Sequence, residues 1–205
     1  MKVTIRLPAL INMVVSSIEV YKKEAFGFLL GRRQRGNYIV DHAVIFQSAK
    51  RDYEYIALDS HRQNRINKTL RFLVNQKYVG EFHSHADFPE KLSKTDIREM
   101  KKIGEGIVSL LVVVKKSRQF YKWIYNARER SISGTVGDYF VKVMAFEYYG
   151  EKIEKLPIAC PHIKQINKIR KIYEKIQKNL DKADKQKKHA MRTKKRLKKK
   201  LMLSF

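Results

Sequence analysis

The side chains best able to do chemistry lie together in the middle of the chain. His83 and His85 are two residues apart, and Asp96 follows eleven residues after His85. In a strand, residues i and i+2 point to the same face, so the two imidazoles would project side by side. Two histidines and one carboxylate are a known ligand set for catalytic zinc, whose fourth position is open to water. A structural zinc site would need four ligands, commonly cysteines, and the chain has only Cys160.

A helix is expected to begin near the aspartate. Ser93 and Asp96 are three residues apart and would share one helix face, while Ser-x-x-Asp is also typical of a helix N-cap. Ser93 can do both, beginning the helix and presenting its hydroxyl inward. Taken singly, a His-x-His pair is more typical of surface or hydrogen-bonded histidines, and Ser-x-x-Asp of capping. The ordered combination favours a metal site, provided that the helix start lies across from the strand end.

This combination resembles the JAMM motif, the catalytic form of the MPN domain of metalloproteases. The family pattern is a Glu in an early apolar strand, then His-Ser/Thr-His-Pro, six residues, and Ser-x-x-Asp. The chain has His83-Ser84-His85-Ala86, six residues, and Ser93-Lys94-Thr95-Asp96. Upstream, Glu24-Ala25-Phe26-Gly27-Phe28-Leu29-Leu30-Gly31 resembles the Glu-x-x-Gly-x-Leu-x-Gly strand of the family. The resemblance spans about residues 1–127 and extends more weakly to about 160.

The resemblance implies a function and a role for each matching residue. His83, His85 and Asp96 would bind one zinc ion per chain. Glu24 would be the general base toward the attacking water and would return the proton to the leaving amine, and Ser93 would donate to the oxyanion. The implied activity is hydrolysis of the amide or isopeptide bond after the C-terminus of a ubiquitin-like modifier or a sulfur-carrier protein. The extended tail of such a substrate would lie along a sheet edge near the metal by strand addition. Histidines must be neutral to bind zinc, so activity should be lost in acid.

Two residues leave questions open. Ala86 stands where the family has Pro, which removes a rigid φ after the second ligand and affects loop geometry. Glu81 shares a strand face with His83 and is an alternative base or ligand; the family match favours Glu24, with Glu81 as a supporting or surface acid.

The stretches 49–60 and 97–106 are short. The long insertions by which some eukaryotic members bind two ubiquitins are therefore not expected, and small prokaryotic-type members are the nearest likeness.

Two other sites compete with this one. His85, Asp87 and His162 would form a facial triad of a non-haem iron oxygenase, but that choice leaves Glu24, His83, Ser93 and Asp96 unexplained. Cys160 has no histidine tied to it by a motif and is expected to be a small core or surface residue. The remaining histidines carry no motif: His42, His61 and His189.

The elements that must position these residues follow from periodicity. Strands are expected over 2–7, 25–30 (ended by Gly31), 37–48, 78–85, 107–114, and near 119–127 and 138–149; helices are expected over 8–22, over 60–76 and from Ser93 onward. This order predicts an α/β domain over residues 1–160, a mixed curved sheet flanked by helices. The resemblance implies MPN-type, cytidine-deaminase-like layering.

The composition changes after that domain. The 205 residues hold 45 Lys+Arg and 20 Asp+Glu, a net charge of +25, and residues 162–205 account for 17 basic and three acidic ones. Apolar residues recur every three or four positions from Ile163 to Leu180, so residues 161–205 are expected to form a Lys-rich helical extension. It would stay solvated, meet an acidic partner or contact a membrane surface. Alternatively, it would make the chain a nucleic-acid- or ribosome-associated binding protein that uses the MPN-like core only as a scaffold. No signal peptide or membrane span is expected, and the protein is predicted to be soluble and cytoplasmic.

Overall fold

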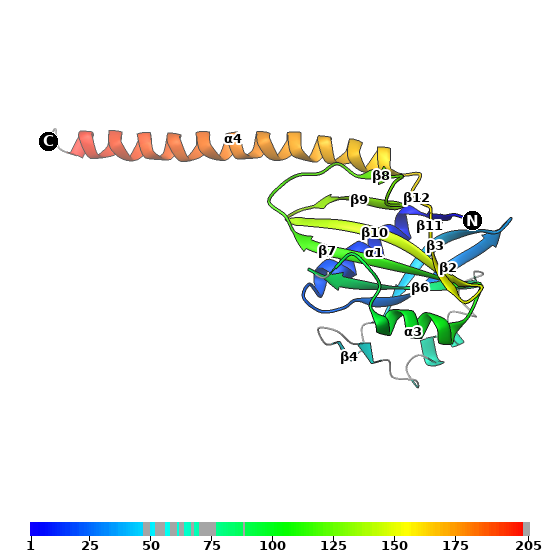
Figure 1. Ribbon diagram of the computed structural model, residues 1–205. Coiled ribbons are helices and arrows are strands. Elements are labelled where there is room, and N and C mark those ends of the chain that lie inside the picture. Colours follow the sequence, from blue (N-terminus) through cyan, green and yellow to red (C-terminus); the bar gives the residue numbers. More distant parts are fainter. Residues whose placement is uncertain are drawn as a thin grey trace. The chain divides into compact units, whose positions relative to one another are not determined.

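The computed structural model describes residues 1–46, 50–51, 56–57, 61, 64–66, 68–69, 77–87 and 89–202 (Figure 1). The chain divides into two compact units, Met1–Ile163 and Lys164–Phe205. The first is a mixed α/β domain with a curved sheet, which confirms the predicted fold class. Most of the helix predicted over 60–76 lies outside the described residues, as does the end of the strand predicted over 37–48.

One ten-stranded sheet forms the domain. Its strands follow the order β12-β1-β3-β2-β6-β7-β10-β9-β8, with β11 paired to β10. Their bounds are β1 Val3–Ile5, β2 Phe26–Gln34, β3 Asn37–Ile45, β6 Lys77–Ala86, β7 Val108–Lys116, β8 Ile124–Asn126, β9 Ser131–Val136, β10 Tyr139–Tyr149, β11 Lys152–Leu156 and β12 Ile158–Ala159. A separate pair is made by β4 Lys50–Arg51 and β5 Ile56–Ala57. The strand that carries the two histidines, β6, is therefore internal, between β2 and β7.

The central strands form the core. β7 is buried on both faces from Val108 to Val114, as its unbroken apolar run predicts. On one side the helix α1, Leu7–Glu19, packs against β3 and β7. On the other side lies α3, Lys94–Ile103, preceded by Leu92, which packs on Leu111, Val113 and Met144. The strand that carries the histidines is thus held between two layers.

The sheet departs from the prediction at several strands. β2 does not end at Gly31 but continues to Gln34. Gly31 lies where the pairing with β3 shifts register, and a side chain there would collide with the carbonyl oxygen of Ile39, so glycine permits close approach instead of ending the strand. The strand predicted over 119–127 is confined to Ile124–Asn126, and β9, β11 and β12 were not predicted.

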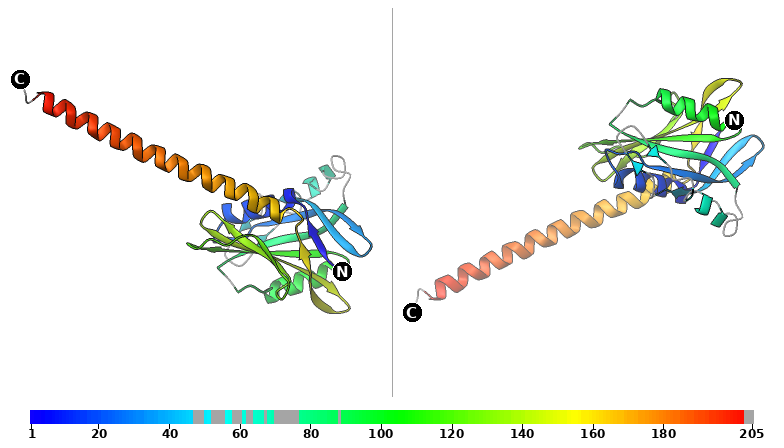
Figure 2. Two further views of the ribbon diagram at one scale, coloured as in Figure 1. Left: turned by 90° about the horizontal axis from the view of Figure 1, so that it is seen from above. Right: turned by 90° about the horizontal axis from the view of Figure 1, so that it is seen from below.

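The second unit consists of one helix. α4 runs without interruption over Ile163–Met202, including the Lys-rich half (Figure 2). Among the described residues, no helix has both the length and the apolar character that crossing a membrane requires.

Candidate metal centre

The two histidines project from the same face of β6. β6 pairs with β7 in parallel, with His83 opposite Leu111 and His85 opposite Val113. Both imidazoles are buried, and their ring centroids are 5.1 Å apart. Because β6 is paired with β7 along this stretch, and at His83 also with β2, the imidazoles have little freedom to move apart.

Asp96 completes the cluster from the first turn of α3. Its Oδ1 lies 3.5 Å from His83 Nε2, and its Oδ2 lies 3.4 Å from His85 Nε2. One donor atom from each of the three side chains lies within 4.8 Å of the others, and this is the group of possible metal ligands that the described part of the chain contains. The helix start does lie across from the strand end, as the site requires.

A capping box fixes the carboxylate of Asp96. The backbone N–H of Ser93 donates to Asp96 Oδ2 at 2.6 Å, and the backbone N–H of Asp96 donates to Ser93 Oγ at 3.1 Å. The cap therefore orients the proposed ligand as well as beginning the helix. In this arrangement the Ser93 hydroxyl acts as an acceptor, so its own hydrogen remains able to donate to another group.

Glu24 reaches the cluster from the segment before β2. Its Oε1 lies 3.7 Å from His85 Nε2, and its side chain is largely buried. The next residue, Ala25, is held by two hydrogen bonds to Ser84, which lies between the histidines: the Ala25 N–H donates to Ser84 Oγ at 2.8 Å, and the Ser84 N–H donates to the Ala25 carbonyl at 2.9 Å. The sequence analysis assigned no role to Ser84. Its position between the two histidines could have indicated that it lies at the site.

The charges of the cluster support one another. Burial by itself would lower the pKa of His83, but the Asp96 carboxylate, with Glu24 and Glu81, outweighs burial and raises that pKa above its ordinary value. Burial would likewise raise the pKa of Asp96, yet the two imidazoles hold it far below its usual range. Asp96 is therefore ionised at neutral pH, the form that a metal ligand needs.

The donor atoms fit a zinc ion. His83 Nε2 is buried and has no hydrogen-bond partner of normal geometry among the described residues; its 3.5 Å approach to Asp96 is too long for a strong hydrogen bond. Tetrahedral zinc with bonds of about 2.0–2.1 Å separates its ligand atoms by about 3.3–3.4 Å. The distance from His83 Nε2 to Asp96 Oδ1 and that from His85 Nε2 to Asp96 Oδ2 each lie close to that separation, and one donor atom from each residue lies within 4.8 Å of the others. His83, His85 and Asp96 would hold the ion.

The loop between His85 and Ser93 is tied down at both ends. At its start, the Tyr21 hydroxyl donates to Asp87 Oδ2 at 2.5 Å, and the Asp87 N–H donates to the Val114 carbonyl at 3.1 Å. These bonds fix the chain directly after Ala86, where the family proline is missing. Burial, and then the bond to Asp87, raise the pKa of Tyr21 to about 12.

A buried lysine holds the other end of the loop. Lys142 Nζ on β10 lies 2.5 Å from Glu90 Oε2 in the loop and 2.5 Å from Glu129 Oε2, and Lys115 Nζ lies 3.1 Å from Glu90 Oε1. Burial opposes the charge of Lys142, but the two carboxylates raise its pKa, and the lysines lower that of Glu90. The sequence analysis did not predict this cluster. A lysine inside the apolar run of β10 could have indicated a buried ion pair.

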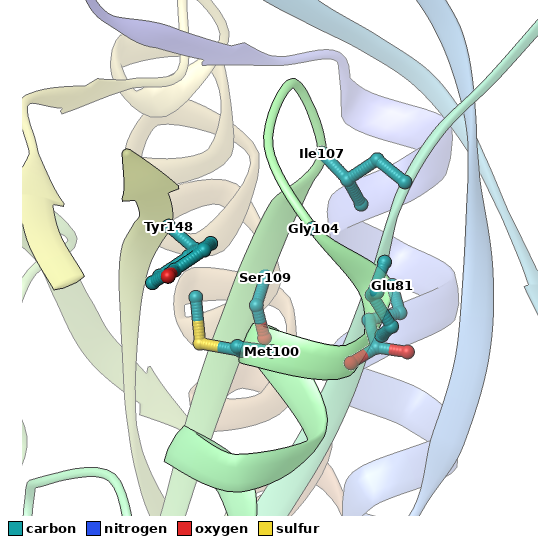
Figure 3. Close-up of a pocket in the computed structure, with 7 residues that line it drawn as sticks. Glu81, Met100, Gly104, Ile107, Ser109 and Tyr148 are labelled. Atoms are coloured by element: carbon teal, nitrogen blue, oxygen red, sulfur yellow. The ribbon is translucent and has the colours of Figure 1, made fainter. Parts of the chain in front are cut away.

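Glu81 lies on β6 two residues before His83, near the proposed ligands but outside their group. It lines a small pocket beneath α3 with Ser109, Met100 and Tyr148, and Figure 3 shows its carboxylate there. Burial raises its pKa, and the carboxylates of Asp96 and Glu99 add to the rise against the opposing effect of His83. Glu81 is not part of the ligand group. It is half-buried and is therefore not a surface acid, and its carboxylate lines the pocket instead of lying beside His85 as that of Glu24 does.

The rival sites are not assembled. His85 belongs to the cluster with Asp96, whereas Asp87 is bound by Tyr21, and neither forms a ligand group with His162 in the described part of the chain. Cys160 is a buried free thiol whose pKa burial raises, which disfavours the thiolate that a nucleophile needs.

Comparisons with known proteins agree with this architecture. Residues 7–125 match the model of a family described as prokaryotic homologues of the JAB domain. The solution structure of protein DSY2949 from Desulfitobacterium hafniense is similar, with a TM-score of 0.56 and 17% sequence identity over 77% of this chain and 92% of that one; at that identity the likeness shows the fold. No curated protein sequence matches the chain.

Proposed function

The chain belongs to the family of prokaryotic homologues of the JAB domain, and from that premise we propose that it is a zinc-dependent peptidase. It would hydrolyse the amide or isopeptide bond that follows the C-terminus of a ubiquitin-like modifier or a sulfur-carrier protein. The observation that carries the proposal is the convergence of His83, His85 and Asp96, with the Glu24 carboxylate 3.7 Å from His85 Nε2. Three ligands beside a further carboxylate are typical of hydrolytic zinc sites, whereas structural sites are closed by four ligands.

The residues of the site divide the work of hydrolysis. Zinc would supply the Lewis acidity that makes a water molecule nucleophilic near neutral pH. Glu24 would accept the proton of that water as its oxygen bonds to the carbonyl carbon, and would deliver it to the nitrogen as the C–N bond breaks. Ser93 would donate its hydroxyl hydrogen to the carbonyl oxygen as negative charge develops there. The products are a carboxylate and a protonated amine, which together hold every atom of the amide and the water, so no other reactant is needed.

The route of the substrate is constrained by the sheet. An extended C-terminal tail often adds as a strand to a sheet edge, but both strands beside the site, β2 and β6, already have neighbours on both sides. The pairing of β6 with β2 ends at His83, with one further bond from the Ser84 N–H, whereas its pairing with β7 continues to Ala86. Strand addition near the metal, which the family resemblance led us to expect, would therefore have to use the end of β6 that follows Ser84. The modifier as substrate is proposed from family membership, and the experiment below tests it directly.

Two isosteric substitutions test the proposal. The substrate is a ubiquitin-like protein joined by its C-terminus to a peptide amine or to a lysine side chain. We expect the zinc-loaded chain to cleave it at the modifier C-terminus. Glu24→Gln should keep its zinc and lose activity by about 10²–10⁴-fold. The matched control, Glu81→Gln, removes the other nearby carboxylate and should keep both. Absence of cleavage by the zinc-loaded wild type, or loss of activity in Glu81→Gln alone, would overturn the proposal.

A further inference from the structure

The helix α4 carries an exposed apolar stripe. Ile169, Tyr173, Ile176 and Leu180 expose 55%, 64%, 51% and 56% of their surface. In proteins most of the stability of a helix comes from packing its apolar face, not from intrinsic propensity. The stripe therefore calls for a partner that covers it.

The spacing of the stripe identifies the kind of partner. From Ile166 to Ala190, positions spaced alternately three and four residues apart are apolar, with the one exception of Lys187, and this spacing is a heptad repeat. The a positions are Ile166, Tyr173, Leu180 and Lys187, and the d positions are Ile169, Ile176, Ala183 and Ala190. A repeat of 3.5 residues is the pattern of a coiled-coil seam, because it keeps the same side chains facing another helix.

The charges of α4 are sorted with respect to this seam. Of the ten Lys and Arg residues from Lys164 to Lys188, eight fall at the outer positions b, c and f. They are Lys164, Lys168, Lys171, Lys175, Lys178, Lys182, Lys185 and Lys188. The flanking e and g positions between residues 165 and 186 hold only two charges, Arg170 and Asp184, and Arg170 is 3.0 Å from Glu174 of the same helix. An acidic partner helix would have no row of lysines beside the seam to pair with. A second copy of α4 can lie there, because the two copies bring no row of like charges together beside the seam.

From this sorting of charge we propose that α4 pairs with α4 of a second copy of the chain as an antiparallel two-stranded coiled coil. Reversing one helix places a positions opposite d positions. When Ile176 of one copy faces Leu180 of the other, Tyr173 faces the small Ala183 of the second copy. A parallel pair would instead set tyrosine against tyrosine and alanine against alanine, leaving crowded and underfilled layers.

The charges near the seam favour the same orientation. An antiparallel pair sets Lys187 opposite the apolar Ile169 of the second copy, where its long stem can pack while the ammonium reaches water. It also brings Arg170 near Asp184 of the second copy, an opposite-charge pair repeated at both ends. A parallel pair would set Lys187 against Lys187 and would match neither Arg170 nor Asp184 with an opposite charge.

The mass of the full chain in solution tests the pairing. Sedimentation equilibrium should give twice the chain mass of 24.3 kDa, and the dimer should tighten as salt rises, because salt screens the outer lysines. The double variant Ile176→Lys/Leu180→Lys should be a monomer. The matched control Asp181→Lys adds a lysine at outer position b and should stay a dimer. Lys187→Leu should tighten the dimer about tenfold, because it buries more apolar surface in the seam. A wild-type monomer at every salt concentration would overturn the proposal.

Cysteine cross-linking tests the orientation. In the antiparallel pair, Tyr173→Cys/Ala183→Cys should form disulfide-linked dimers on oxidation, whereas Tyr173→Cys alone should not. Cross-linking by Tyr173→Cys alone would indicate a parallel pair and overturn the orientation.

Nucleic acid is the competing occupant of α4. A short duplex oligonucleotide would bind the outer lysines with an affinity that falls as salt rises. If the wild type is a monomer that binds the oligonucleotide, and Ile176→Lys/Leu180→Lys binds it as well, the apolar stripe has no role and the proposal fails. Zinc content and cleavage activity should be the same in these α4 variants, which separates this test from that of the proposed function.

Discussion

Removing one buried hydroxyl tests how Glu24 is positioned. Ser84→Ala deletes the acceptor of the Ala25 N–H bond, 2.8 Å long and buried, while the Ser84 N–H bond to the Ala25 carbonyl remains. A buried donor left without a partner costs about 1–3 kcal/mol. With a slope of about 2 kcal/mol per M of urea, the unfolding midpoint should fall by about 0.5–1.5 M. Since a displacement of about 1 Å costs about 10²-fold in rate, cleavage should weaken by up to that factor with zinc retained.

A serine on the next strand provides the matched control. Ser109 is equally buried, but its hydroxyl has no hydrogen-bond partner among the described residues. Ser109→Ala removes the same atom and should leave stability unchanged or slightly raised, because an unpaired polar group is no longer buried. Urea unfolding in the presence of a chelator compares the two variants without a contribution from zinc. Equal unfolding midpoints for Ser84→Ala and Ser109→Ala would show that the bond from the Ala25 N–H to Ser84 Oγ does not stabilise the fold.

Three further predictions concern the cap, the pH dependence and the loop. Ser93→Gly removes the hydroxyl that would donate to the carbonyl oxygen, so turnover should fall by about 10²–10³-fold, measured by single-turnover cleavage. Its free energy of unfolding in urea should fall by only a few tenths of a kcal/mol, because Gly is also tolerated as a helix cap. Unchanged turnover would show that Ser93 has no part in the mechanism. Because the pKa of His83 is raised in the zinc-free chain, zinc should displace a proton and bind more tightly as the pH rises through that pKa, and calorimetry in buffers of different ionisation enthalpy should detect the proton. The raised pKa of His83 also stabilises the folded zinc-free chain. That stabilisation is fully present below a pH of about 6.5, the ordinary pKa of histidine, and is lost as the pH rises through the pKa of His83 in the folded chain. Zinc binding that does not depend on pH would contradict the raised pKa of His83. Lys142→Met should slow cleavage with little loss of zinc, because Glu90 loses its buried partner, whereas Lys115→Met, which removes the more exposed partner of Glu90, should have a smaller effect on the same assay.

The centre of the domain could be predicted because its signals are local. The unbroken apolar run of β7 indicated a buried strand, the Gly, aromatic and His residues of β6 indicated a strand, and Ser93 with Asp96 indicated the start of α3. The structure brings Asp96 within 3.4–3.5 Å of the two histidines, as the motif required.

What the sequence did not predict depends on contacts between distant segments. Gly31 looked like the end of a strand, but the close approach of β3 makes it part of one. The bond from Ala25 to Ser84 spans 59 residues, and that from Lys142 to Glu90 spans 52. Such contacts leave no periodic pattern in the chain, so only the folded arrangement shows that they hold the segment of Glu24 and the loop.

Zinc titration of the chelator-treated wild type tests whether the chain is a zinc-dependent peptidase. Cleavage of the modifier fusion is measured as zinc is added back to the full chain. The rate should rise from zero and reach its plateau at one zinc ion per chain, since His83, His85 and Asp96 form one ligand group. A cleavage rate that does not depend on zinc would contradict this prediction. So would a His83→Ala variant that lacks the ligand group and still reaches the same rate as zinc is added.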